Sequence, residues 1–207
     1  MTGPTDRIAF ADIDTQFDFI DPQGKLYAPG AEAIRENLGR LVRHARDHAI
    51  PLISSIDAHG DDDAEFDQFP PHCLKGSEGA AKIPETRTGA ETFVENVDRD
   101  IHELPDPRAT HVVVEKQQFP IFTNPVAEKL FAKTGAGTVV VFGVVTEVCV
   151  RFAVLGLLER GYAVRLVTDA IWPITEADGD AAIREMSAAG ATLTTTAEVL
   201  ALSPARA

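Results

Sequence analysis

Short apolar runs alternate along the chain with segments whose apolar residues recur at helical spacing. Continuous apolar strands that alternate with helices are typical of a parallel sheet covered on both faces. We therefore predict that residues 1–207 form a single domain, a three-layer α/β/α sandwich with a six-stranded parallel, Rossmann-like sheet. The expected strands span Ile8–Ile13, Pro51–Ile56, Val112–Glu115, Thr138–Phe142, Ala163–Thr168 and Ala191–Thr194.

The helical pattern predicts four helices, and one long segment interrupts the alternation. These helices span Ala31–Ala49, Pro125–Lys133, Thr146–Glu159 and Glu176–Ala189. The interrupting segment, Asp57–Arg108, is rich in Pro, Gly and Asp. A connection of this length inside a compact domain is usually functional. We expect part of it, around Glu91–Leu104, to be helical.

Residues with useful chemistry follow four of the expected strands. In open parallel sheets, ligands bind outside the carboxyl ends of the strands. Asp14 follows the first strand, Asp57 and His59 follow the second, Lys116 follows the third, and Cys149 follows the fourth. The sequence therefore predicts a site at this edge of the sheet.

Cys149 lies where a buried strand passes through a tight turn into the first turn of a helix. The positive end of a helix dipole lowers the pKa of a thiol, and backbone N–H groups there can hold an oxyanion. Free cysteine is also often a small, buried, apolar residue. A role as nucleophile therefore depends on its partners.

Lys116 and Asp14 are the expected partners of Cys149. An ammonium group beside a cysteine stabilises thiolate, and a carboxylate nearby can carry protons to and from a leaving group. Asp12 is an alternative carboxylate on the same strand, but the spacing to Gln16 and Asp18 favours Asp14.

A second group of residues has metal-ligand chemistry. Asp57 and His59 form an i, i+2 pair, and Glu65 and His72 follow in the long segment. Carboxylate and imidazole ligands suit Zn, Mn or Fe. Taken alone, the residues leave a metal site and an incidental pair of histidines equally open. We interpret the run Asp61–Asp63 as solvated.

Three sequence features together resemble the isochorismatase-like cysteine hydrolase superfamily over nearly the whole chain: Asp14-Thr15-Gln16-Phe17-Asp18-Phe19, Lys116, and Gly143-Val144-Val145-Thr146-Glu147-Val148-Cys149-Val150. The resemblance implies Asp14 as general acid and base, Lys116 as the charge beside the thiol, and Cys149 as nucleophile. It also implies a cis peptide at Val144–Val145 and an oxyanion hole formed by the N–H groups of Val145 and Cys149.

Within the superfamily, Asp57-Ala58-His59 followed by Glu65 and Pro70-Pro71-His72-Cys73 resembles the nicotinamidase and pyrazinamidase branch. This likeness implies one divalent ion, Zn in preference to Mn or Fe, held by Asp57, His59, Glu65 and His72. The pyridine nitrogen of nicotinamide could occupy the open position of such an ion. Phe19, Phe69, Phe119 and Phe122 are candidates for the aromatic walls of the substrate site.

The expected function is thus that of a nicotinamidase, an amidohydrolase of NAD salvage that forms a cysteine thioester. The alternatives are a metal-free isochorismatase-type, carbamoyl or maleamate-like hydrolase, and a catalytically silent binding domain. A net charge of −13 argues against nucleic acid and anionic membranes as partners. Two cysteines and the lack of a long apolar run favour a cytoplasmic protein. The resemblance implies a small amide as substrate. The sequence leaves open whether it forms a homo-oligomer.

Overall fold

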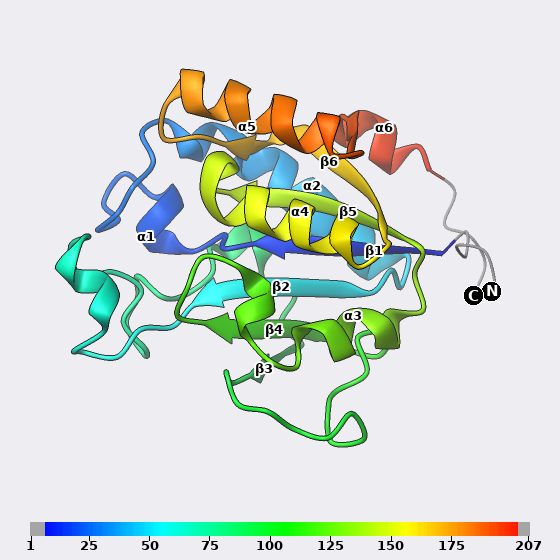
Figure 1. Cartoon of the computed structure of the whole chain (residues 1–207), viewed down its shortest axis with the longest axis horizontal. Helices are drawn as coiled ribbons and strands as arrows, with labels where there is room; N and C mark the ends of the chain where they lie inside the picture. Colours follow the sequence, from blue (N-terminus) through cyan, green and yellow to red (C-terminus); the bar gives the residue numbers. More distant parts are fainter. Residues whose placement is uncertain (1–6, 203–207) are drawn as a thin grey trace.

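The computed structural model describes residues 7–202, which form one seven-stranded sheet in which every strand pair is parallel. The strand order is β3-β4-β2-β1-β5-β6-β7. Figure 1 shows the strands running in one direction, so that their carboxyl ends share one edge of the sheet. The strands are β1 (Ile8–Ile13), β2 (Leu52–Asp57), β3 (Glu91–Val94), β4 (His111–Lys116), β5 (Thr138–Val144), β6 (Ala163–Trp172) and β7 (Thr192–Thr194).

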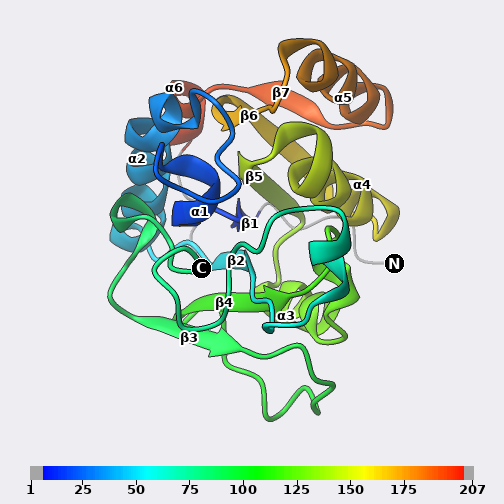
Figure 2. The same cartoon turned by 90° about the vertical axis from the view of Figure 1, so that its left-hand side faces the viewer.

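In the described part of the chain, six α-helices cover the two faces of the sheet. Figure 2 shows the helices in two layers, one on each side of the sheet. One layer contains α1 (Phe17–Ile20), α2 (Arg35–Asp47) and α6 (Thr196–Leu200), and the other contains α3 (Ala127–Thr134), α4 (Arg151–Glu159) and α5 (Glu176–Ala188). Short 3-10 turns lie at η1 (Ala31–Ile34), η2 (Ala64–Asp67), η3 (Pro84–Thr86) and η4 (Ile121–Thr123), and a π-helical turn, η5, spans Thr146–Val150.

The alternation of side chains along the strands builds a separate apolar core on each face. On β1, Phe10 joins the core beneath α2, whereas Ala11 and Ile13 join the core beneath α3 and α4. Because both faces of the central strands are buried, these strands are apolar throughout. The three-layer α/β/α prediction is confirmed, with one more strand than expected.

The additional strand, β3, corrects the prediction of a helix around Glu91–Leu104. Glu91–Val94 pairs in parallel with β4, with Thr92 opposite Val112 and Phe93 opposite Val113. Thr, Phe and Val favour strands, and the open edge of β4 supplies the hydrogen-bond partners that a short strand needs. The helix α6 was also absent from the predictions. It begins with a capping box between Thr195 and Glu198.

The central position of β1 determines where the site forms. β1 pairs with β2 on one side and with β5 on the other, so the strand order changes direction there. Gly143 on β5 has φ +123°, and a Cβ at this position would lie 2.0 Å from the carbonyl oxygen of Ile13. Only glycine allows the end of β5 to approach β1 this closely. Within residues 7–202, no helix is long and apolar enough to span a membrane.

Candidate active site

The structure brings Asp14, Lys116 and Cys149 together at the carboxyl edge of the sheet. The ammonium of Lys116, fully buried at the end of β4, lies 2.8 Å from Oδ2 of Asp14 and 3.6 Å from Sγ of Cys149. It also forms an ion pair with Oδ1 of Asp57. One cation is therefore shared by two buried carboxylates and a thiol.

The backbone turns sharply at Asp14, which has φ +49° directly after β1. Its Oδ1 accepts a hydrogen bond of 2.6 Å from the hydroxyl of Ser55, and its other oxygen faces Lys116. Asp12 has different partners. Its carboxylate binds Lys82 at 2.5 Å and Ser54 at 3.0 Å. The geometry therefore assigns Asp14, and not Asp12, to the cluster around the thiol.

Cys149 lies in the turn that connects β5 to α4. The peptide between Val144 and Val145 is cis, as the resemblance implied, and the carbonyl of Val145 accepts the N–H groups of Val148 and Val150. The expected helix from Thr146 to Glu159 therefore begins as the π-helical turn η5 and continues as α4. Cys149 is 6% exposed, at the floor of a cavity.

The electrostatics at Cys149 correct one expectation. Burial raises the pKa of the thiol well above its usual value, and Asp14 and Asp57 add to this effect, although Lys116 opposes it. Burial alone would lower the pKa of Lys116, but Asp14 and Asp57 outweigh burial and raise it. The free protein therefore holds an ammonium and a thiol, so the thiol must lose its proton during the reaction.

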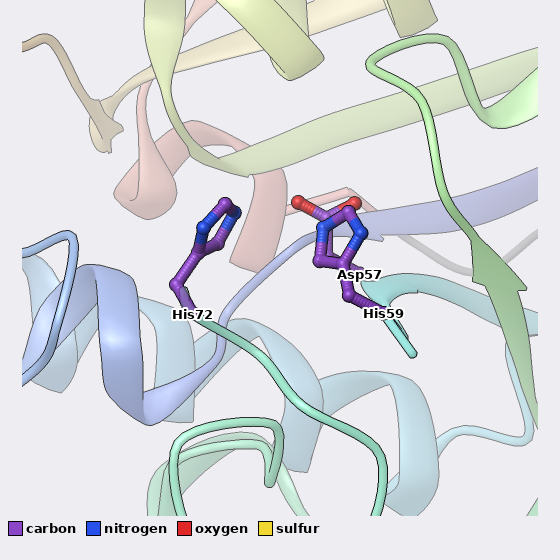
Figure 3. Close-up of side chains that lie close together, drawn as sticks. All are labelled: Asp57, His59 and His72. Atoms are coloured by element: carbon purple, nitrogen blue, oxygen red, sulfur yellow. The ribbon is translucent and has the colours of Figure 1, made fainter. Parts of the chain in front are cut away.

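Asp57, His59 and His72 form a buried group that could hold a metal ion. One ligand atom from each residue lies within 4.8 Å of the other two. Figure 3 shows the carboxylate of Asp57 beside the two imidazole rings, with Asp57 and His59 at the end of β2 and His72 on a separate loop. Asp57 thus belongs both to this group and to the ion pair with Lys116.

The unpartnered atoms of this group fit a metal. Nε2 of His59 and Nε2 of His72 are buried without a hydrogen-bond partner in the described part of the chain. Burial lowers the pKa of His72, which keeps its imidazole neutral near pH 7, as a metal ligand must be. Two imidazoles and a carboxylate suit Zn, with Mn and Fe also compatible.

Glu65 lies at the border of this group. Its Oε1 is 3.8 Å from Nε2 of His72, beyond hydrogen-bond reach, and Glu65 is not among the three residues whose ligand atoms converge. Asp63, which we had interpreted as solvated, instead places Oδ2 2.9 Å from Nδ1 of His59. That interpretation is wrong for Asp63, because η2 turns its side chain back towards β2.

A cavity of about 260 Å³ opens above Cys149. Phe19, Phe69 and Phe119 line it, together with Asp57 and His72. Phe122 does not line it, which corrects the fourth aromatic prediction. A Cβ on Gly156 would lie 2.6 Å from the Phe122 ring, and the guanidinium of Arg160 lies 3.8 Å from the ring centroid. The ring is held against α4, and its role is packing.

Two motif residues with no predicted role support the site. The side-chain amide of Gln16 binds both the N–H and the carbonyl of Asp57, each at 2.7 Å. Oδ2 of Asp18 accepts the N–H of Cys73 at 2.7 Å, next to His72. Their fixed spacing from Asp14 was the available signal. The residues that they hold lie 41 and 55 positions away, so the sequence did not show the contacts.

Comparison with known proteins agrees with this geometry. The family model described as the isochorismatase domain matches residues 9–97 and 89–198. The chain belongs to the isochorismatase family. Membership of this family identifies the protein as a hydrolase, as the sequence predicted.

Relatives within the isochorismatase family include amidases. The chain is 26% identical to the nicotinamidase of Escherichia coli K12 over 219 residues, covering 90% of this chain and 93% of that protein. An isochorismatase-like hydrolase from Alkaliphilus metalliredigens has a similar structure, with TM-score 0.78 and 25% identity over 94% of this chain and 97% of that one. The pyrazinamidase of Pyrococcus horikoshii in complex with zinc gives TM-score 0.75 and 25% identity, over 91% and 99% of the two chains.

Proposed function

We propose that this protein is a nicotinamidase, which hydrolyses nicotinamide to nicotinate and ammonia through a thioester on Cys149. The proposal is carried by one observation: the thiol and the metal-binding group line the same cavity. Cys149 and two members of the metal-binding group, Asp57 and His72, line the same space of about 260 Å³. A small aromatic amide is the substrate that uses both.

The cavity walls favour a neutral aromatic substrate. Its lining is mostly apolar, with the rings of Phe19, Phe69 and Phe119. Neither Lys nor Arg lines this cavity in the described part of the chain, whereas two carboxylates, Asp57 and Glu65, do. A substrate that carries its own carboxylate would meet no Lys or Arg side chain in the lining to act as its counter-ion. This charge distribution argues against maleamate-like, carbamoyl amino acid and isochorismate-type substrates.

Asp57, His59 and His72 would hold a divalent ion, with Glu65 beside them. When bound, the ion supplies a Lewis-acidic position that can take the nitrogen of a pyridine ring. Burial raises the pKa of Glu65, and the nearby charge of Asp57 adds to that rise. Negative groups crowded in this way favour a cation between them.

The reaction starts at the thiol. Ligand atoms of Cys149 and Asp14 lie within 4.8 Å of each other, so Asp14 can accept the thiol proton as sulfur attacks the amide carbon. The N–H groups of Val145 and Cys149 hold the oxyanion. Asp14 then gives its proton to the amide nitrogen, the C–N bond breaks, and ammonia leaves a thioester.

Water completes the cycle. Asp14 takes a proton from a water molecule whose oxygen attacks the thioester carbon, and the C–S bond breaks. The sulfur recovers the proton from Asp14, and the acid product leaves as nicotinate with release of a proton to solvent. Throughout both halves, Lys116 stays an ammonium between Asp14 and Asp57 and stabilises negative charge on sulfur.

Ammonia release from a panel of amides tests the proposal. We expect turnover of nicotinamide and pyrazinamide. For maleamate and N-carbamoylsarcosine we expect kcat/KM to be at least about 100-fold lower, which corresponds to about 3 kcal/mol less transition-state stabilisation. Cys149→Ala should abolish turnover and still bind nicotinamide. The control is Cys73→Ala, which removes a fully buried thiol that does not line the cavity. Turnover of the carboxylate substrates alone, or of nicotinamide by Cys149→Ala, would refute the proposal.

A further inference from the structure

The carboxylate of Asp63 contacts the metal-binding group from outside. Its Oδ2 lies 2.9 Å from Nδ1 of His59, and its Oδ1 accepts the N–H of Glu65 at 3.0 Å. The side chain of His59 is fully buried and that of Asp63 is 15% exposed. This carboxylate therefore joins a buried imidazole to the first turn of η2.

The contact fixes the proton on one particular nitrogen of His59. An ionised carboxylate can only accept hydrogen bonds, so Nδ1 must carry the hydrogen that Asp63 receives. Nε2 of the neutral ring then has a free lone pair, and this atom is buried with no hydrogen-bond partner among residues 7–202. His72 shows the same arrangement, because its Nδ1 lies 2.9 Å from the carbonyl oxygen of Pro70.

We propose that Asp63 is a positioning residue for the metal site, which fixes the tautomer and orientation of His59 and thereby strengthens metal binding. A carboxylate on the far nitrogen of a histidine ligand makes the ring a better donor and restricts its rotation. The inference rests on the metal-binding part of the proposed function, and it does not depend on which amide is hydrolysed.

The same run of sequence contains matched controls. Asp61, Asp62 and Asp63 are consecutive, but Asp61 and Asp62 are exposed, whereas Asp63 contacts His59. Asp62→Ala changes the net charge of the loop as Asp63→Ala does, without touching His59. Asp63→Asn removes the negative charge and replaces one of the two acceptor oxygens with an NH2 group, so one acceptor remains for either His59 or Glu65.

The experiment measures zinc affinity of metal-free protein by competition with a chromophoric chelator. We expect Asp63→Ala to weaken zinc binding about 10- to 100-fold, the usual effect of losing such a partner. Asp62→Ala should stay within about 3-fold of wild type, and Asp63→Asn should lie between the two. Thermal melting of each metal-free variant reports whether the loss of the η2 cap affects folding.

Two results would overturn the inference. If wild type and Asp63→Ala bind zinc with equal affinity, Asp63 has no positioning role, although the metal site itself remains. The same conclusion follows if Asp62→Ala and Asp63→Ala lose zinc affinity equally. If Asp63→Ala does not fold, Asp63→Asn decides, and wild-type affinity in that variant has the same meaning. Wild-type protein that binds no zinc would overturn the metal part of the proposed function as well, so the two failures are distinguishable.

Discussion

The side chain of Gln16 holds the backbone of Asp57 from both sides. Its Oε1 accepts the N–H of Asp57, and its Nε2 donates to the carbonyl of the same residue, each at 2.7 Å. Asp57 in turn contacts Lys116 and belongs to the metal-binding group. One amide near the start of the chain therefore sets the position of the carboxylate that the thiol cluster and the metal group share.

Replacement of Gln16 with Leu should damage both stability and activity. The variant leaves the buried N–H and carbonyl of Asp57 unpaired, and each unpaired group costs about 1–3 kcal/mol. We expect the free energy of unfolding in urea to fall by about 2–4 kcal/mol, with a lower kcat. Gln117→Leu is the control, since Gln117 bonds to the carbonyl of Ala58 and to the side chain of Asn96 but not to Asp57. Equal losses in the two variants would contradict the special role of Gln16.

Lys116 and Lys82 offer a paired test of the buried cation. Both are buried and both pair with a buried aspartate, Asp14 and Asp12 respectively, but only Lys116 contacts Cys149. Replacing either with Met leaves an uncompensated buried carboxylate, which costs about 3–5 kcal/mol. We expect Lys116→Met to reduce kcat by at least about 1,000-fold, because about 4 kcal/mol of charge stabilisation is lost. Folded Lys82→Met should keep activity within about 10-fold of wild type. If Lys116→Met and Lys82→Met lose activity equally, the loss comes from disturbed folding and not from the missing charge beside Cys149.

His111 should make the fold sensitive to mild acid. Burial, with Lys82 adding to it, lowers the pKa of His111 to about 4. The unfolded chain takes up this proton near the ordinary histidine pKa of about 6.5, so stability is present above that value and is lost as pH falls towards 4. The full loss is about 3 kcal/mol.

Chemical denaturation between pH 7.5 and pH 4 would measure this loss. In the variant His111→Gln the amide can still bond to Ser54, the partner of His111 Nε2 at 2.7 Å, but the group does not titrate. We expect the difference in unfolding free energy between wild type and variant to shrink by about 3 kcal/mol over this range. A constant difference across the range would show that His111 does not titrate as described.

Phe69 and Phe122 should affect different quantities. Phe69 lines the cavity and lies 6.3 Å from the Phe119 ring, whereas Phe122 packs on α4 beneath Arg160. Phe69→Ala should raise KM for nicotinamide about 10-fold, because contact with an aromatic ring contributes about 1 kcal/mol or more. Phe122→Ala should lower the melting temperature and leave KM within about 2-fold. An increase in KM for Phe122→Ala alone would reverse the assignment of the two rings.

Removal of divalent metal should inhibit turnover reversibly. Dialysis against a chelator should lower kcat/KM for nicotinamide, and Zn, Mn or Fe should restore it. His72→Ala should abolish this response, because the ring supplies one of the two unpartnered Nε2 atoms. His48→Ala is the control, since His48 is exposed on the far end of α2. Full activity in a preparation shown to be metal-free would contradict the ligand assignment.

The sequence predicted those residues whose role depends on their place at a strand end. Asp14 and Cys149 follow buried strands and Lys116 ends one, and parallel pairing brings such strand ends to one edge. Asp63 was misjudged because a carboxylate in an acidic run has no distinguishing local pattern, and only the turn of η2 directs it to His59. Phe122 was misplaced because an aromatic residue carries no indication of which surface it meets.

The two halves of the sheet meet at β1 and contribute different numbers of side chains to the cluster around the thiol. Asp14 follows β1, and Asp57 and Lys116 end β2 and β4. These three strands all precede Gly135, whereas Cys149 follows β5. During synthesis, the first half can assemble its buried charges while one edge of β1 still lacks a neighbour. The reactive sulfur joins them only when β5 docks against that edge. A chain divided between α3 and β5 would therefore separate Asp14 and Lys116 from Cys149. Under the proposed mechanism, we expect hydrolysis to return only when the two fragments reassemble.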